Sequence, residues 1–256
     1  MSPVPRYNVQ GVAISALTLD QACDLVLGAR GRSHAGYICT CTAHGIGEAQ
    51  RDPAYRHILN RSWLTTPDGM PLVWLGQLQG FRPVTRVYGP DLMLAVCDRG
   101  RAAGLRHFFF GGAPGVADAL AARLTARFPG LQVTGTFTPP FRALSGDEFA
   151  QLQTAVSAAR PDVFWVGLGT PKQDHFMAAH WDRLDAGVLI GVGAAFDFLS
   201  GRKKQAPRWL QRSGLEWLFR LGQEPRRLGR RYLVDNPLFL LRAFAQFTGL
   251  KKYPLD

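Results

Sequence analysis

The sequence is short of cysteine and of long apolar runs. Its four cysteines form no Cys-x-x-Cys pair and come with no matching histidine spacing, so neither a zinc site nor a disulfide framework is expected. No stretch reaches about 18 apolar residues, and the segment Met1 to Tyr7 lacks the basic and apolar regions of a signal peptide. We therefore expect a cytoplasmic chain without a transmembrane helix, which reaches a membrane only by attaching to its surface.

Several nucleotide and metal motifs are missing as well. Gly191-x-Gly193 lacks the third glycine of a dinucleotide fingerprint, and no Walker-type Gly-Lys-Ser/Thr is present. Hydride transfer with NAD and P-loop phosphoryl transfer are therefore disfavoured. The chain also contains no Asp-x-Asp pair of the kind that holds a divalent metal in many sugar-nucleotide enzymes. We expect neither a metal nor a cofactor.

The positive charge of the chain is concentrated near its end. The 256 residues carry a net charge of +11, with 46% hydrophobic residues, which is typical of a folded globular protein. Residues 201–256 hold 13 Lys and Arg against 4 Asp and Glu, so only +2 belongs to the first 200 residues. Basic tails of this kind usually meet anionic lipid, phosphate or nucleic acid.

Apolar runs of strand length alternate with helical patterns from about residue 35 onward. This alternation is the signature of βαβ units and of a mainly parallel sheet. The predicted strands are 36–42, 62–66, 105–110, 161–169 and 187–193. The predicted fold is α/β, with a Rossmann-like, mainly parallel sheet flanked by helices and a C-terminal basic helical appendage. We expect a catalytic core over residues 1–200 and the appendage over residues 201–256.

The appendage carries two helical patterns, from Pro207 to Leu221 and from Arg226 to Phe247. A cluster of four arginines opens the second pattern, and an apolar face follows. The positions of that face are Leu238, Leu241, Phe244 and Phe247. A basic, amphipathic helix can lie on an anionic membrane, which makes the appendage a predicted membrane-docking lid.

The ends of the predicted strands are where a ligand is expected, because turn backbones and helix N-termini offer N–H groups to phosphate there. Each glycine turn taken alone is more often structural than phosphate-binding. Asp68, between Pro67 and Gly69, is commonly a turn former in such a context; the alternative is a general base acting on a hydroxyl. Arg86 and the arginines of the appendage are either solvated surface charges or cations that stabilise a departing diphosphate.

Seven short motifs occur in a fixed order along the chain. They are Thr40-Cys41-Thr42-Ala43-His44, Pro67-Asp68-Gly69-Met70-Pro71, Arg86-Val87-Tyr88-Gly89-Pro90-Asp91-Leu92, Phe110-Gly111-Gly112-Ala113-Pro114-Gly115, Gly167-Leu168-Gly169-Thr170-Pro171-Lys172-Gln173, Gly191-Val192-Gly193-Ala194-Ala195-Phe196-Asp197 and Leu215-Glu216-Trp217-Leu218-Phe219-Arg220. In this order they resemble the TagA/WecG/CpsF glycosyltransferases, glycosyltransferase family 26, from about residue 37 to residue 232.

The resemblance implies an inverting, metal-independent enzyme. Such an enzyme would move a hexose or an N-acetylhexosamine of the N-acetylmannosamine type from a UDP-sugar to a polyprenyl-diphosphate-linked saccharide, in cell-surface polysaccharide synthesis. It would work as a peripheral protein on the inner face of the bacterial cytoplasmic membrane. By the same resemblance, Asp68 is the expected base and Thr40 lies close to the reacting sugar.

The resemblance also implies a set of residues that bind the nucleotide-sugar. Arg86 and Gln173 would line the donor pocket, and Asp197 would help to hold the nucleotide. Further expected binding residues are Arg220, Arg227 and Arg230, which would reach the diphosphate, together with Thr42, His44, Gly111, Gly112, Gly169, Pro171 and Lys172. Thr42 departs from the family, which usually has asparagine there, so a hydrogen bond to donor or acceptor is expected to differ.

Two other functions remain open from the sequence. A pI of about 10.1 with clustered arginines also suits a nucleic-acid-binding protein, although the nearly neutral core and the apolar face of the appendage favour lipid, and we expect no nucleic-acid partner. Thr42 in place of asparagine makes a noncatalytic nucleotide-binding subunit the second alternative.

Overall fold

The computed structural model describes residues 3–32 and 34–255, apart from the side chains of residues 227, 230 and 231. The chain forms two compact units, each assembled from separate stretches. The first unit contains Met1–Thr18, Cys41–Val87 and Gln205–Asp256, and the second contains Leu19–Thr40 and Tyr88–Lys204. The basic appendage therefore packs in the same unit as residues 41–87.

The second unit is built on parallel strands in the order β3-β8-β7-β5-β6. Their bounds are Gly36–Cys41 for β3, Arg106–Gly111 for β5, Gln132–Phe137 for β6, Val163–Gly167 for β7 and Val188–Gly191 for β8. With β4 (Leu64–Pro67), the sheet has six strands. The predicted Rossmann-like α/β fold is confirmed.

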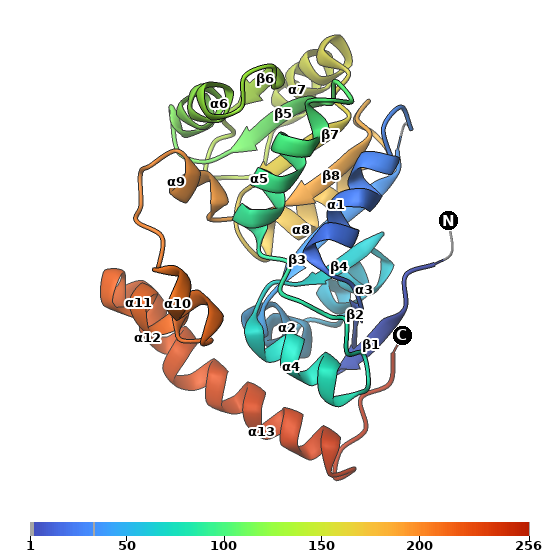
Figure 1. The fold of residues 1–256 in the computed structure, drawn as a ribbon, viewed down its shortest axis with the longest axis vertical. Coiled ribbons are helices and arrows are strands. Elements are labelled where there is room, and N and C mark those ends of the chain that lie inside the picture. The colour runs from blue at the N-terminus through green and yellow to red at the C-terminus, as the bar shows by residue number, and fades with distance from the viewer. Residues whose placement is uncertain (1–2, 33, 256) are drawn as a thin grey trace. The chain divides into compact units, whose positions relative to one another are not determined.

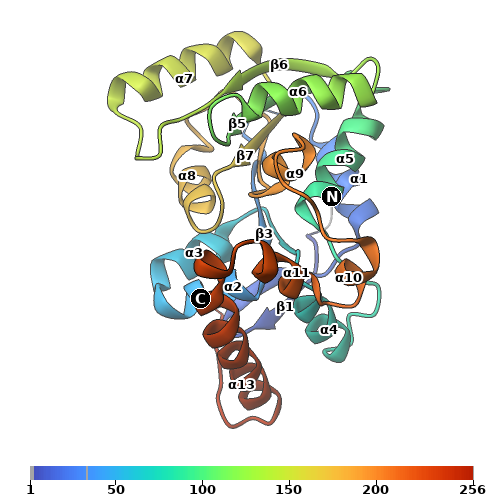
Figure 2. The same cartoon turned by 90° about the vertical axis from the view of Figure 1, so that its left-hand side faces the viewer.

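Helices cover both faces of this sheet. Figure 2 shows α7 and α8 on one side of the strands and α1, α5, α6 and α9 on the other. Their bounds are Leu19–Gly28 for α1, Gly89–Gly100 for α5, Val116–Arg127 for α6, Gly146–Ala159 for α7, Lys172–His180 for α8 and Ala195–Leu199 for α9. Because both faces are covered, the central strands are buried and read as continuous apolar runs rather than as alternating ones.

Aromatic side chains of β5 and β7 form the centre of this core. The rings of Phe108 and Phe164 stack with their centroids 5.3 Å apart, and Phe110 stacks on Phe176 of α8 at 4.5 Å. The buried indole N–H of Trp165 donates a hydrogen bond of 3.0 Å to Nδ1 of His107. A buried polar group with such a partner avoids the penalty of an unsatisfied donor.

The first unit starts with an antiparallel hairpin, β1 (Arg6–Val9) and β2 (Val12–Ser15), which the sequence analysis did not predict. Its two-residue turn places Gln10 and Gly11 at positive φ, as a hairpin turn of this length requires. The helices of this unit are α2 (Ala43–Arg51), α3 (Pro53–Arg61), α4 (Met70–Leu78), α10 (Arg208–Arg212), α11 (Glu216–Gln223), α12 (Pro225–Arg230), η1 (Arg231–Asp235) and α13 (Asn236–Phe247). Pro53 opens α3 directly after α2, at a position of the first helical turn that suits proline.

The long last helix, α13, is fastened to the hairpin (Figure 1). Gln246 donates to the backbone carbonyl of Asn8 at 3.0 Å and accepts from the backbone N–H of Gln10 at 2.8 Å. Gln10 in turn donates to the carbonyl of Phe239 at 3.0 Å. The chain then returns beside β1, where Asn8 donates to the carbonyl of Tyr253 at 2.6 Å. These bonds fix which side of α13 faces inward.

The outward side of α13 is apolar. Phe239 and Ala243 are buried, whereas the exposed large side chains are Leu240, Leu241, Phe244 and Phe247. Three of the four positions predicted for the apolar face are therefore exposed, and Leu238 is half-buried. Within the described ranges, every helix falls short of the length and apolar character that a membrane span requires.

Candidate active site

Asp68 lies at the carboxyl end of β4, in the turn that leads into α4. The backbone N–H groups of Asp68 and Gly69 both point at the carbonyl of Cys41, the last residue of β3, at 2.9 and 3.4 Å. The N–H of Val87 donates to the carbonyl of Pro67 at 2.9 Å. These backbone bonds hold the Pro67-Asp68-Gly69 turn beside the segment that carries Arg86, so the predicted base sits at a strand end.

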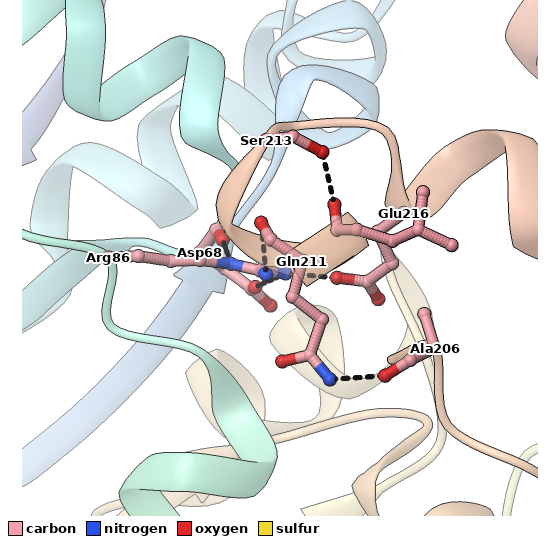
Figure 3. A network of polar contacts seen from close by, with 7 residues as sticks. Asp68, Arg86, Ala206, Gln211, Ser213 and Glu216 are labelled. Carbon is pink, nitrogen blue, oxygen red and sulfur yellow. Dashed lines mark hydrogen bonds and ion pairs between the residues drawn. The ribbon is translucent and has the colours of Figure 1, made fainter. Parts of the chain in front are cut away.

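Arg86 joins this turn to the helices of the appendage (Figure 3). Its Nη2 lies 3.3 Å from Oδ1 of Asp68 and 2.7 Å from Oε2 of Glu216. Its Nε donates to the backbone carbonyl of Asp68, and its Nη1 donates to the carbonyl of Gln211 at 3.4 Å. One guanidinium thus bonds to the predicted base, to the end of α10 and to the start of α11.

The turn between α10 and α11 is held in place by packing as well as by hydrogen bonds. The buried side chain of Gln211 donates to the carbonyl of Ala206 at 2.6 Å (Figure 3). Gly214 has a φ of +76°, and a Cβ at this position would lie 2.8 Å from the Trp74 ring of α4. Only glycine combines this backbone conformation with such a close approach. The turn therefore delivers Glu216 to Arg86 from a defined position.

The environment of Asp68 makes its carboxylate unusually basic. The pKa of Asp68 is raised from 3.8 to about 6. Burial is the largest cause and the negative charge of Glu216 adds to it, while Arg86 and Arg220 act in the opposite direction. A carboxylate with this pKa is ionised at neutral pH and is a stronger base than an exposed aspartate. General bases work best when their pKa lies near the working pH.

His44 lies in a different polar cluster of the first unit. Its Nδ1 is 3.7 Å from Oε1 of Glu48 and 3.9 Å from Oδ2 of Asp235, and Arg51 bonds to both of these acidic side chains. Thr42 is the N-cap residue of α2. Arg51 thus links α2 to η1, and His44 lies beside both carboxylates. A pocket role for His44 or Thr42 stays a prediction.

The second unit gathers its own group of predicted residues at the ends of β3 and β8. The hydroxyl of Thr40 donates to the carbonyl of Gly191 at 2.8 Å. The buried side chain of Gln173 accepts from the backbone N–H of Gly193 at 2.9 Å. A Cβ on Gly191 would lie 2.9 Å from Nε2 of Gln173. Thr40 and Gln173 are therefore held by the same strand-end backbone.

The glycine turn after β5 is required by the packing of two strand ends. Gly111 has a φ of +128°, and a Cβ there would lie 2.7 Å from the carbonyl of Gly167 at the end of β7. The N–H of Gly112 donates to that carbonyl at 3.1 Å. The approach of the two strand ends requires glycine at position 111, and phosphate binding by Gly111 or Gly112 stays a prediction.

The remaining predicted residues of the second unit flank its helices. Gly169, at φ +77°, and Pro171 form the turn into α8, which Lys172 opens with an exposed side chain. Asp197 on α9 forms an ion pair of 3.2 Å with Lys203. No cluster of three or more His, Cys, Asp and Glu side chains that could hold a metal occurs among the residues that the structure describes.

Comparison with known proteins places nearly the full length of the chain in one family. Residues 7–253 match the model of the Glycosyl transferase WecG/TagA/CpsF family. The chain belongs to this family. The match spans both compact units and the appendage, so the resemblance carried by the seven motifs is confirmed, and the protein is a glycosyltransferase.

Two named relatives of this WecG/TagA/CpsF protein are both N-acetylglucosaminyldiphosphoundecaprenol N-acetyl-beta-D-mannosaminyltransferases. The protein from Bacillus spizizenii (strain ATCC 23059 / NRRL B-14472 / W23) is 30% identical over 199 residues, which cover 78% of this chain and 76% of the relative. The protein from Bacillus subtilis (strain 168) is 29% identical over 209 residues, covering 80% and 77%.

Sequence reasoning did not single out Glu216, which the structure brings to Arg86. It lies within the last of the seven motifs, yet no role was predicted for it. One signal could have found it, since Glu216 is the only acidic residue between Asp197 and Glu224. Of the three appendage arginines predicted to reach the diphosphate, Arg220 lies close enough to Asp68 to lower its pKa. The side chains of Arg227 and Arg230 lie outside the described part of the structure.

Proposed function

We propose that this glycosyltransferase moves an N-acetylhexosamine of the N-acetylmannosamine type, or a related hexose, from a UDP-sugar to a polyprenyl-diphosphate-linked saccharide. The observation that carries the proposal is Asp68, a carboxylate at a strand end with a pKa of about 6 and a guanidinium beside it. The relatives' names, which specify an undecaprenyl-diphosphate acceptor and N-acetylmannosaminyl transfer, support the choice of substrates.

The proposed reaction is a single inverting displacement at the anomeric carbon. Asp68 takes the proton of an acceptor hydroxyl while that oxygen bonds to the anomeric carbon, and the bond from this carbon to the diphosphate oxygen breaks. UDP leaves with its electron pair. Preorganised cationic side chains stabilise such developing charge. We assign this task to Arg86 and to the arginines Arg220, Arg227 and Arg230 of the appendage, and we propose that no metal is required.

Donor recognition is assigned to residues of the second unit. Thr40 and Gln173 are held by the backbone at the ends of β3 and β8, and Asp197 and Lys172 lie at the N-terminal turns of α9 and α8. Strand ends and helix N-termini of parallel sheets are the usual place for phosphate groups. This arrangement supports a nucleotide-binding role for the second unit.

The appendage is proposed to dock on the inner face of the cytoplasmic membrane, where a lipid-linked acceptor is available, and to act as a lid. The exposed face of Leu240, Leu241, Phe244 and Phe247 on α13, within a segment of net charge +9, supports this role. Helices of this kind bind through buried apolar area and through attraction to anionic lipid.

The reaction is tested by measuring UDP release from a panel of UDP-sugars, with a polyprenyl-diphosphate saccharide in detergent and EDTA present. We expect acceptor-dependent release by the wild type and a loss of about 100-fold or more in Asp68→Asn, because general bases contribute at least this much. Asp185→Asn, which removes an exposed carboxylate of the second unit, is the matched control. Release by Asp68→Asn at wild-type rates would refute the assignment.

Membrane docking is tested by sedimentation with anionic liposomes. The double variant Leu241→Ser, Phe244→Ser should lose most binding, since it removes two exposed apolar side chains from α13. Phe141→Ser removes an exposed phenylalanine of the second unit and should bind like the wild type. Equal binding by all three proteins would rule out α13 as the docking element.

A further inference from the structure

Arg86 stands between two carboxylates and is closer to the one that the proposed mechanism does not use. Its Nη2 is 2.7 Å from Oε2 of Glu216 and 3.3 Å from Oδ1 of Asp68. All three side chains are largely withdrawn from solvent, with exposed fractions of 17% for Arg86, 14% for Asp68 and 11% for Glu216. In such surroundings each charge acts strongly on the others.

The geometry indicates that the two carboxylates compete for one donor. An arginine and a carboxylate left to themselves favour short, paired hydrogen bonds of about 2.8 Å. Here the short bond goes to Glu216, and the contact to Asp68 is the longer one. The Nε and Nη1 groups donate to the backbone carbonyls of Asp68 and Gln211, and these bonds help to define the position of Nη2 relative to the two carboxylates.

Glu216 is placed by the tertiary structure and not by its neighbours in sequence. It is 130 residues from Arg86 along the chain and lies in the first turn of α11. The turn that precedes it is fixed by the Gln211 hydrogen bond and by the contact of Gly214 with Trp74. A glutamate exposed on the surface of a basic appendage would not require a turn that is fixed in this way.

We propose that Glu216 is a positioning residue for the transfer reaction. By holding Nη2 of Arg86 from α11, it draws the guanidinium away from Asp68 and leaves the Asp68 carboxylate able to accept the proton of the acceptor hydroxyl. The proposal rests on the proposed role of Asp68 as the base. The appendage thereby acts on proton transfer as well as on membrane docking.

The electrostatics agree with this geometry. Among the side chains that the structure describes, Arg86 and Arg220 lower the pKa of Asp68 and Glu216 raises it. Without the charge of Glu216, Arg86 is free to move toward Asp68, and both changes lower the pKa of that carboxyl. A less basic Asp68 is a weaker proton acceptor in the transition state.

The test compares the pH dependence of kcat/KM for the wild type and Glu216→Gln, which keeps the shape and an acceptor oxygen but removes the charge. We expect the acidic limb of the profile to move down by about one pH unit, and kcat at pH 7.5 to fall about threefold to tenfold. The donor KM should change less than about twofold, because donor recognition is assigned to Thr40, Gln173, Asp197 and Lys172 of the second unit, which the substitution leaves in place. Glu216→Asp, which restores the charge, should return the limb toward the wild-type position.

Glu224→Gln is the matched control, since it removes a negative charge from the same segment, at the C-cap of α11. Its acidic limb should coincide with that of the wild type. If Glu216→Gln lowers kcat or the melting temperature while its acidic limb stays at the wild-type pH, Glu216 only supports the fold and the proposal is overturned.

A second measurement does not depend on turnover. The gain in melting temperature at pH 8 caused by Asp68→Asn should be smaller in the Glu216→Gln background than in the wild type, because the ionised Asp68 is then better compensated. Equal gains in both backgrounds would overturn the coupling. Sustained transfer by Asp68→Asn would instead refute Asp68 as the base, whatever Glu216 does, so the two failures are distinguishable.

Discussion

Replacing the proposed base should make the protein more stable as well as inactive. Asp68→Asn substitutes a neutral amide of the same shape for a carboxylate whose pKa is raised to about 6, first by burial and then by Glu216. Arg86 keeps its shorter contact, to Glu216. The variant therefore removes a poorly solvated negative charge, while Arg86 keeps an anionic partner. Enzymes commonly keep a catalytic group that lowers the stability of the fold.

The magnitude and the sign follow from the two pKa values. The native pKa of about 6 lies about two pH units above the ordinary value of 3.8, and each unit corresponds to about 1.4 kcal/mol. Because the native state holds the proton more tightly than the unfolded chain, the stabilising effect of protonation is fully present below pH 3.8 and is lost as the pH rises through about 6. Above that pH, Asp68→Asn should be more stable than the wild type by up to about 3 kcal/mol.

Thermal unfolding of both proteins at pH 4, 6 and 8 measures this effect. A gain of about 2 kcal/mol corresponds to roughly 4–8 °C for a chain of this length. We expect the difference in melting temperature to be near zero at pH 4 and largest at pH 8. Asp185→Asn, an exposed carboxylate, should follow the wild type throughout. A variant that is less stable than the wild type at pH 8, or that gains equally at pH 4 and pH 8, would refute the reasoning.

Two further predictions concern the second unit. Gly191→Ala should raise the donor KM several-fold, because the added Cβ would lie 2.7 Å from Cε of Met177 and 2.9 Å from Nε2 of Gln173, so that both side chains must shift. Gly28→Ala, with open space around it, should be neutral or stabilising by about 0.5–1 kcal/mol. An unchanged donor KM in Gly191→Ala would count against Gln173 as a donor contact. Burial lowers the pKa of His107 from 6.5 to about 4. The neutral, buried ring therefore contributes fully to the free energy of unfolding above pH 6.5, and this contribution is lost as the pH falls toward 4, because the unfolded chain binds the proton first. His107→Gln keeps an acceptor for the indole of Trp165 and should lose less melting temperature than the wild type between pH 7.5 and pH 5; equal losses would contradict this account.

Local pattern was sufficient to predict the parallel core. Strands β5, β7 and β8 are buried on both faces, so they read as short continuous apolar runs, and each predicted run overlaps an observed strand. Pro53 ends one helix and begins the next because it lacks an N–H and fits the first helical turn. The exposed apolar face of α13 was also evident, since helical periodicity depends only on residues three or four apart.

Elements with weak local signals were missed. β6 holds Thr134, Gly135 and Thr136 and is only half-buried at the edge of the sheet, so its composition is that of a loop. The hairpin of β1 and β2 turns through Gln10, which is not a typical residue for a turn with positive φ. Its side chain is buried and bonded to Phe239 of α13, a partner that no window of local sequence contains.

The sequence by itself determined the α/β fold, the basic amphipathic appendage and, through seven ordered motifs, the family. These properties depend on composition, periodicity and short segments. Only the tertiary structure decided that the appendage packs with residues 41–87, and that Glu216 meets an arginine 130 residues away which it shares with Asp68. Contacts of that separation depend on how the folded segments pack, and no local pattern of residues encodes them.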